Sequence, residues 1–314
     1  MNLQTRVEDG MPSSNQSMRI QIGDICCSIT CSDRDVFSYL KELYSDFLSD
    51  GPADINIELE IVERLSADEI RKVMPHARGL RTDNRFTTTN LTLESEYDPN
   101  THSLSMVVEK HLLNPNMEYK LMNRIVPAVY FTAYGVHCGV KPPAMIVHAC
   151  GIARREHALI FTGPSETGKT TIAQLCGDKY GRILNDEMVL ISWPDGDNHR
   201  LRVQGLPIVG GVSQRLNISA PLCCVLMLKQ GKRMGLRQLD QTEAYLRFIR
   251  QVIAPAGVEM KEDKRSLLSL TTEFSNRVVR DTVFYELEFN LDREMFWGVI
   301  EELEKSLEKG VPAK

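Results

Sequence analysis

The sequence predicts an α/β fold preceded by a smaller α+β unit, and two features of the 314-residue chain support this prediction. From Met145 onward, short apolar runs alternate with Gly-rich turns and helical patterns, which is typical of a layered α/β domain. Before that point, strand-like runs surround helical segments. We therefore divide the chain into a tail expected to be disordered at 1–17, an N-terminal α+β unit at 18–140 and an α/β domain at 141–310.

Composition excludes several classes of function. The chain is 42% hydrophobic and 25% charged, as expected for a globular protein. Its net charge of -5 and pI near 5.9 give no basic field for nucleic acid. The sequence has no run of 18 or more apolar residues that would span a membrane, and its polar start does not resemble a secretory signal. We expect a cytoplasmic protein.

The chain contains 8 cysteines, whose spacing matches neither a disulfide framework nor a paired CxxC metal site. Cys26, Cys27 and Cys31 lie in a strand-like run, and adjacent residues on a strand point to opposite faces, which argues against a shared metal. We expect mostly buried thiols in a reducing compartment. The full set is Cys26, Cys27, Cys31, Cys138, Cys150, Cys176, Cys223 and Cys224.

The first half of the N-terminal unit shows both kinds of periodicity. Residues 18–31 are predicted to form one or two strands. Ser32 is a candidate cap for a helix whose apolar residues repeat at helical spacing to about residue 48. Residues 55–63 alternate between apolar and polar side chains, which predicts a half-buried strand.

The second half of this unit adds two strands and a helix. Residues 85–94 and 102–110 are strand candidates, and the sequence YDPNT at 97–101 is the expected turn between them. Residues 116–135 are predicted to be helical, with a kink or break at Pro127.

A phosphate-binding motif stands near the start of the α/β domain. The sequence GPSETGKT fits the pattern G-x-x-x-x-G-K-[ST], with an apolar strand before it and a helix after it. Glycines let such a loop present its N–H groups to a phosphate, and the helix N-terminus adds positive charge. Lys169 would reach the β- and γ-phosphates of ATP, and the Thr170 hydroxyl would join a Mg²⁺ shell. The predicted nucleotide-binding residues are Gly163, Pro164, Ser165, Glu166, Thr167, Gly168, Lys169, Thr170 and Thr171.

Two carboxylates follow the motif in the apolar sequence GRILNDEMVLIS. Asp186 and Glu187 are predicted to lie in the middle of a strand, where a carboxylate is costly to bury without a partner. A Mg²⁺ ion at the nearby loop would be such a partner, and we predict metal or catalytic roles for the pair. Neighbours on a strand face opposite ways, so one would meet the metal and the other would act through water or accept a proton. The alternative is solvated charges at a strand end.

Taken together, the order of these segments resembles a known family. A strand with His148 (MIVHACGI), a turn, a strand into the phosphate loop and then the acidic pair resemble the catalytic domain of HPr kinase/phosphorylase. They are more closely similar to bacterial HPr kinase-like proteins, some of which accompany peptide-modification genes. The resemblance covers about residues 144–230 and is looser over 115–143 and 231–300. It implies the fold of phosphoenolpyruvate carboxykinase around the nucleotide.

The resemblance also implies roles for individual residues. Lys169 and Thr170 would hold phosphate and Mg²⁺. Asp186 would be the catalytic aspartate that accepts the proton of a serine hydroxyl, and Glu187 stands where the family has a second, metal-binding aspartate. His148 would lie near the phosphates, although a lone histidine on a strand is more often a core residue. HPr kinase is a hexamer, so the resemblance implies self-association.

The sequence departs from the family at two places. Ala149 stands where HPr kinase has a glycine. The segment RLRVQGLPIVGG at 200–211 only half resembles the one that approaches the protein substrate and supports phosphorolysis in HPr kinase. The resemblance therefore implies neither HPr itself as the acceptor nor, above all, the reverse reaction. Arg215, just beyond, is a candidate for neutralising a phosphate. The turn residues of this segment, which would otherwise form a tight structural loop, are Gly205, Pro207, Gly210 and Gly211.

Three functions remain open at this point. The first is an ATP- and Mg²⁺-dependent kinase acting on a hydroxyl of a peptide, protein or small molecule. The second is a non-catalytic nucleotide-binding scaffold for peptide-modifying enzymes, with the N-terminal unit binding the partner. The third is an ATPase or GTPase switch, although the sequence lacks an NKxD-like run for guanine. The intact acidic pair favours the kinase, and no oxaloacetate-binding pattern supports a carboxykinase.

Overall fold

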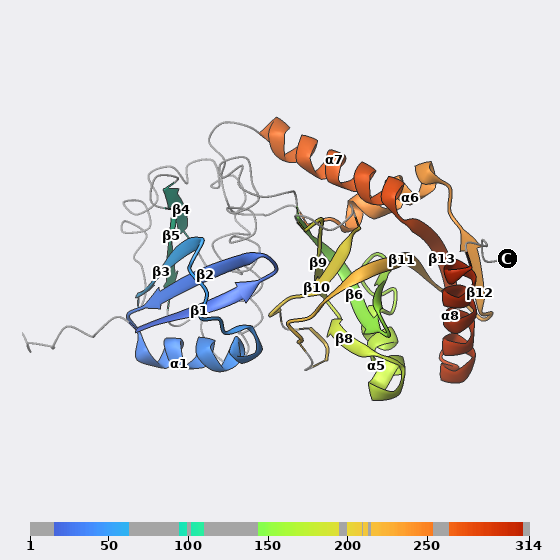
Figure 1. Cartoon of the computed structure of the whole chain (residues 1–314), viewed down its shortest axis with the longest axis horizontal. Coiled ribbons are helices and arrows are strands. Elements are labelled where there is room, and N and C mark those ends of the chain that lie inside the picture. The colour runs from blue at the N-terminus through green and yellow to red at the C-terminus, as the bar shows by residue number, and fades with distance from the viewer. Residues whose placement is uncertain are drawn as a thin grey trace, which may run out of the picture.

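The computed structural model describes residues 16–62, 94–98, 102–109, 144–194, 200–208, 210–212, 215–253 and 264–309. These residues form a mixed α/β structure with a five-stranded sheet and an eight-stranded sheet (Figure 1). The predicted helix at 116–135, Pro127 and Cys138 lie outside the described residues. In the described part of the chain, every helix is too short or too polar to cross a bilayer.

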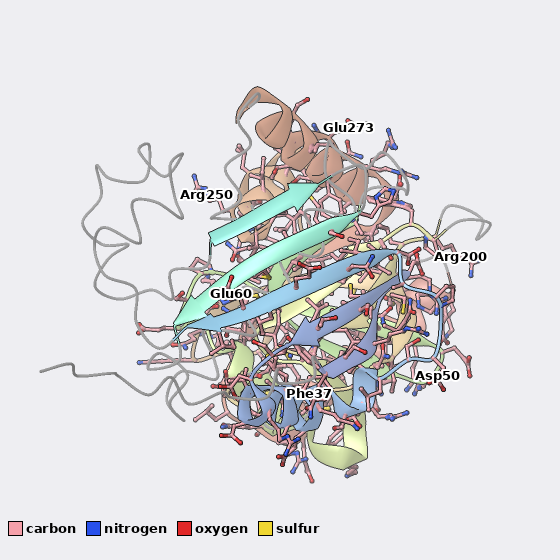
Figure 2. The ribbon with its side chains drawn as sticks, turned by 90° about the vertical axis from the view of Figure 1, so that its left-hand side faces the viewer. Phe37, Asp50, Glu60, Arg200, Arg250 and Glu273 are labelled. Carbon is pink, nitrogen blue, oxygen red and sulfur yellow. The ribbon has the colours of Figure 1, made fainter. Side chains whose placement is uncertain are left out.

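The smaller sheet belongs to the N-terminal unit and has the strand order β1-β2-β3-β5-β4. β1 and β2 form an antiparallel hairpin, whereas β2, β3 and β5 run parallel. Figure 2 views the molecule from this side: Glu60 of β3 is exposed, and its neighbour Leu59 is buried, as period-2 alternation requires. The strands are β1 (Gln16–Ile22), β2 (Ile25–Cys31), β3 (Ile55–Val62), β4 (Glu94–Asp98) and β5 (Ser103–Glu109).

The predicted strands at 18–31, 55–63 and 102–110 are confirmed, but several boundaries were wrong. β1 begins at Gln16, inside the predicted tail. The turn expected at 97–101 starts too early, because β4 continues through Asp98 to pair with Ser103. Helix α1 (Arg34–Leu43) is capped by Asp33 instead of Ser32, since the Asp33 carboxylate accepts from two backbone N–H groups. The helix ends at Leu43, and the short 3₁₀ turn η1 (Ser45–Phe47) follows it.

The larger sheet has the order β10-β9-β6-β7-β11-β13-β12, and β8 also pairs with β6. Its central strands β7, β11 and β13 are parallel neighbours. The strands are β6 (Met145–Arg154), β7 (His157–Thr162), β8 (Arg182–Asn185), β9 (Met188–Ser192), β10 (Arg202–Gly205), β11 (Ser219–Gln230), β12 (Gly235–Gln238) and β13 (Val283–Phe289). The helices are α5 (Lys169–Tyr180), α6 (Gln241–Phe248), α7 (Lys264–Asp281) and α8 (Arg293–Glu308), with a 3₁₀ turn η5 (Ile249–Gln251).

Helices cover both faces of this sheet. Alternate residues of β7 enter different cores: Leu159 and Phe161 pack with residues of α5 and α8, and Ala158 and Ile160 pack with residues of α6 and α7. A strand buried on both faces reads as an apolar run, which explains why the strand before the phosphate motif was recognisable in sequence.

A third core joins the two sheets. It contains Ile20 and Phe47 of the N-terminal unit together with Leu190, Leu206 and Ile208 of the α/β domain. The Asn217 side chain also donates to the backbone carbonyl of Gln21 at 3.5 Å. The two units therefore share buried surface.

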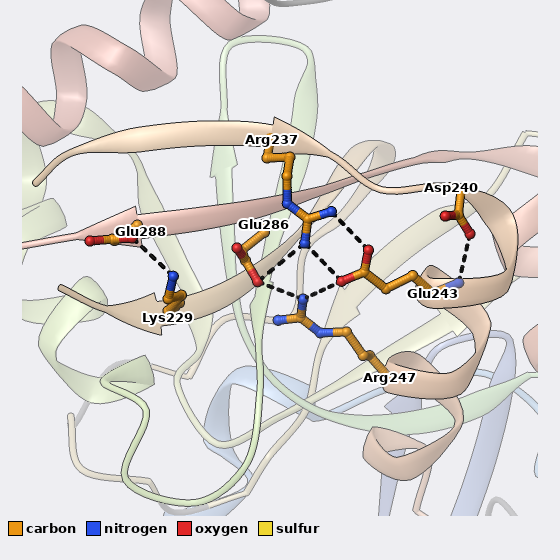
Figure 3. A network of polar contacts seen from close by, with 7 residues as sticks. All are labelled: Lys229, Arg237, Asp240, Glu243, Arg247, Glu286 and Glu288. Atoms are coloured by element: carbon orange, nitrogen blue, oxygen red, sulfur yellow. Dashed lines mark hydrogen bonds and ion pairs between the residues drawn. The ribbon is translucent and has the colours of Figure 1, made fainter.

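A network of ion pairs ties α6 to the edge of the larger sheet (Figure 3). Arg237 of β12 forms two hydrogen bonds of 2.8 Å with Glu243 of α6. Arg247 contacts Glu243 at 3.1 Å and Glu286 of β13 at 2.7 Å. The bonds from Arg237, then those from Arg247, lower the pKa of Glu243 to about 2.

Candidate functional site

The phosphate loop leaves the C-terminal end of β7 and enters α5 at Lys169. Gly168 has φ of 105°, which favours glycine, and a Cβ there would lie 2.6 Å from the Phe289 ring. A Cβ at Gly163 would lie 2.9 Å from the Thr167 hydroxyl. Close approach therefore favours glycine at both motif positions, and backbone conformation favours it at Gly168 as well.

Lys169 lies inside the loop with only 5% of its surface exposed. Its Nζ donates to the carbonyl oxygens of Gly163 at 3.2 Å and Pro164 at 3.1 Å. Burial lowers the pKa of this lysine, although the charges of Glu187, Cys150 and Asp186 act in the opposite direction. A buried ammonium next to a helix N-terminus is a strong site for an anion.

A pocket of ≈ 290 Å³ opens over the loop. His148 reaches it from β6, and its Nε2 lies 3.5 Å from a carboxylate oxygen of Glu187. The His148 side chain is 22% exposed, so it is not a core residue. The pocket is lined by His148, Ser165, Glu166, Gly168, Lys169, Thr170, Thr171, Glu187 and Gln230.

The sequence predicted that the acidic pair lies in the middle of a strand, and this prediction was wrong. A bend at Asp186 and Glu187 separates β8 from β9. Asn185 causes this break: its Oδ1 accepts from the N–H groups of Glu187 at 2.8 Å and Met188 at 2.9 Å, which is an Asx turn. Its Nδ2 donates to the carbonyls of residues 206 and 208, so the bend is tied to the neighbouring segment.

Asp186 and Glu187 meet different surroundings. Asp186 is 1% exposed, and its two carboxylate oxygens accept from the N–H groups of Gly211 at 3.0 Å and Val212 at 3.3 Å. Gly210 and Gly211 pass so close to this carboxylate that a Cβ at either position would meet it. Glu187 faces the pocket instead. The two carboxylates therefore point to different surroundings, although the cause is the bend at Asn185 and not alternation along a strand.

Not every predicted residue reaches the pocket. Pro164 and Thr167 shape the loop, since the Thr167 hydroxyl donates to the Pro164 carbonyl at 2.7 Å. Gly205 is structural, because a Cβ there would lie 2.0 Å from the Leu216 carbonyl. Arg215 is absent from the residues that line the pocket. The cysteines of β2 are buried in the core between the sheets or beside it.

Sequence reasoning missed two residues of the site. Asn185 sets the bend, and its position before an acidic pair was the available signal. Gln230 lines the pocket from the end of β11 and donates to the carbonyl of Glu166 at 3.0 Å. The phosphate motif carries no signal for Gln230, because it lies 61 residues beyond Lys169 in the chain (230 minus 169).

The groups around the pocket fit a nucleotide with Mg²⁺. The Thr170 hydroxyl and the Glu187 carboxylate are oxygen ligands of the kind that Mg²⁺ prefers. Mg²⁺ usually takes only one or two protein carboxylates and completes its shell with water and phosphate oxygens. Lys169 and the N-terminus of α5 would supply positive charge for phosphate groups.

No family model matches the sequence, and no curated protein matches it. Among solved structures, the HPr(Ser) kinase/phosphatase from Coxiella burnetii is similar, with 9% sequence identity and a TM-score of 0.30. The match covers 52% of this chain and 97% of that chain. The roles assigned below rest on the geometry of this chain.

Proposed function

We propose that this protein is an HPr kinase-like enzyme that transfers the γ-phosphate of ATP, in the presence of Mg²⁺, to a hydroxyl of a peptide, protein or small molecule. A serine hydroxyl is the expected acceptor. The observation that carries the proposal is the pocket at the ends of β7 and β11, where the phosphate loop, its lysine, Thr170, Glu187 and His148 meet. Ligands of parallel sheets bind at this edge.

Each residue has a role in this proposal. Lys169 exchanges the loop carbonyls for the β- and γ-phosphates, while the first N–H groups of α5 bind their oxygens. Thr170 and Glu187 would hold Mg²⁺, and the bound ion would supply positive charge beside the phosphates. His148 orients Glu187 through the 3.5 Å contact. Asp186 accepts the proton of the acceptor hydroxyl, which requires the 210–212 segment to release its carboxylate.

The first test is nucleotide binding. Calorimetry with ATP, GTP and ADP, each with and without Mg²⁺, compares the wild type with Lys169→Ala. We expect Mg²⁺-dependent ATP binding that the variant loses, because Lys169 is the buried cation of the loop. Lys179→Ala, at the exposed far end of α5, is the matched control and retains binding. Equal binding by Lys169→Ala would contradict the assignment of the site.

A non-catalytic nucleotide-binding regulator of a peptide-modification system is the second candidate. The burial of Asp186, with both carboxylate oxygens bonded to backbone N–H groups, favours it, because such a carboxylate does not contact an acceptor in this arrangement. A screen of Ser-containing peptides and small alcohols with labelled ATP separates the two candidates. ATP binding without phosphotransfer or hydrolysis supports the regulator. Self-association, which the proposed kinship also suggests, is tested by light scattering.

A further inference from the structure

Three carbonyl oxygens of the phosphate loop accept hydrogen bonds from side chains. Those of Gly163 and Pro164 accept from Lys169, and Pro164 also accepts from the Thr167 hydroxyl. The carbonyl of Glu166 accepts from Gln230. A loop that binds an anion must turn its N–H groups toward the ligand and its negative carbonyl ends away from it. These bonds therefore hold the loop carbonyls away from the side on which an anion would bind.

Gln230 differs from the other donors in its origin. Lys169 and Thr167 belong to the motif itself, whereas Gln230 comes from the end of β11, the parallel neighbour of β7. Only the NH₂ end of its side chain can donate to a carbonyl, which fixes the orientation of the amide. Glu166 has φ of 67°, in the left-handed region that non-glycine residues avoid. The bond from Gln230 stabilises this unfavourable backbone.

The strand end that carries Gln230 is itself fixed. The N–H of Gly231 donates to the carbonyl of Phe289 at 3.0 Å, and Lys229 pairs with Glu288 at 3.1 Å. The Phe289 ring in turn packs near Gly168 of the loop. The ends of β11 and β13 thus lie against the phosphate loop, and Gln230 reaches from the end of β11 to the carbonyl of Glu166.

We propose that Gln230 is a positioning residue for phosphate binding, which keeps the carbonyl of Glu166 turned away from the anion. The inference rests on the proposed nucleotide site. When Lys169 leaves the carbonyls of Gly163 and Pro164 to bind a phosphate, the bond from Gln230 to Glu166 stays in place. The carbonyl of Glu166 then remains turned away from the phosphate without help from the lysine. Gln230 would act on the phosphates of the ligand through the loop, and not on the nucleoside.

The test removes the N–H donor of Gln230 and keeps a side chain of similar size. Gln230→Met is neutral and similar in size but has no N–H group, and Gln238→Met on the exposed strand β12 is the matched control. Binding of ATP and of inorganic tripolyphosphate is measured by calorimetry with Mg²⁺. We expect Gln230→Met to bind both ligands about 3- to 10-fold more weakly, the range of one hydrogen bond, with an unchanged Tm. The control binds both like the wild type.

Amide hydrogen exchange of residues 165–168 without any ligand gives a second readout. We expect faster exchange in Gln230→Met and no change in Gln238→Met. Unchanged affinity and unchanged exchange in Gln230→Met would overturn the inference and leave the kinase proposal intact. Weaker ATP binding with unchanged tripolyphosphate binding would also overturn it, because Gln230 would then contact the nucleoside. If the wild type binds neither ligand, both the proposed function and the role of Gln230 in anion binding fail.

Discussion

Asp186 and Glu187 illustrate how neighbouring residues of one type acquire different chemistry. Glu187 faces the pocket beside His148, whereas Asp186 is buried under the glycines at 210 and 211. Both carboxylates could be singled out from the sequence, because an acidic pair within an apolar run needs a partner. Asp186 accepts a hydrogen bond from a backbone N–H group that lies 25 residues further along the chain, and no local sequence pattern indicates this partner.

The two carboxylates are expected to respond differently to neutral, isosteric substitution. Asp186→Asn is expected to bind Mg²⁺ and ATP within about threefold of the wild type but to lose roughly 10²- to 10⁴-fold in phosphotransfer, the range of general base catalysis. Glu187→Gln is expected to lose the Mg²⁺-dependent part of ATP binding, since a neutral amide is a weaker ligand for a hard cation. Calorimetry and labelled-ATP assays measure the two effects.

Full phosphotransfer activity in Asp186→Asn would show that this residue is not the base. Thermal unfolding of each variant is the control, because an amide at position 186 presents an NH₂ group to one of the N–H donors of residues 211 and 212. A loss of activity that follows a large fall in Tm would reflect the loop and not the chemistry.

At the scale of elements, the strands with a clean period were predictable and the interruptions were not. Residues 182–192 are apolar on both sides of the acidic pair and look like one strand, yet Asn185 divides them. The bend depends on bonds from Asn185 to carbonyls at 206 and 208, which are long-range contacts. Similarly, the predicted cap Ser32 and the true cap Asp33 are adjacent in the sequence, and both residue types are good caps.

The ion-pair network between α6 and β13 is expected to make the stability of the fold depend on pH in the acidic range. Because the pKa of Glu243 is lowered from its ordinary 4.5 to about 2, the folded state binds its proton less readily than the unfolded state. The stabilising contribution is therefore fully present above about pH 4.5 and is lost as the pH falls toward 2. The urea midpoints of the wild type and Glu243→Gln should differ most near pH 6, and the difference should shrink steadily as the pH falls from about 4.5 toward 2.

Two controls accompany this titration. Glu273→Gln, on an exposed position of α7, should show no such convergence. Added salt should reduce the difference at pH 6, because the network is solvent-exposed and exposed pairs are screened. A constant difference between wild type and Glu243→Gln from pH 6 to 3 would mean that the network does not stabilise the fold through charge.

At the scale of the whole molecule, the change in composition near residue 140 indicated two units, but it gave no sign of the core they share. Leu206 and Ile208 lie in a segment rich in glycine and proline and read as a loop. In the structure they are buried among residues of the N-terminal sheet. Contacts between units so distant in sequence leave no periodic pattern in either unit, so the sequence alone could not predict them.

Ile208 tests whether this shared core makes the two units one cooperative structure. The residue is fully buried, so Ile208→Ala should cost about 2 to 4 kcal/mol of unfolding free energy. We expect both sheets to lose protection together in urea, as measured by hydrogen exchange. Leu246→Ala, at a 55% exposed position of α6, should change stability little. Two separate transitions, with only one shifted by Ile208→Ala, would show that the units unfold independently.

The contacts of α8 with α5 place a tryptophan where its fluorescence can report on α5. The chain has 2 tryptophans, and Trp297 stacks on Tyr180 of α5 at 5.0 Å while its indole N–H donates to the carbonyl of Leu175. Trp193 lies elsewhere, with the guanidinium of Arg277 4.0 Å from its ring. In a Trp193→Phe protein the remaining tryptophan emission would come from Trp297 alone. The protein thus carries an intrinsic fluorophore against the helix that begins at the phosphate loop, and motion of that helix can be followed without a dye.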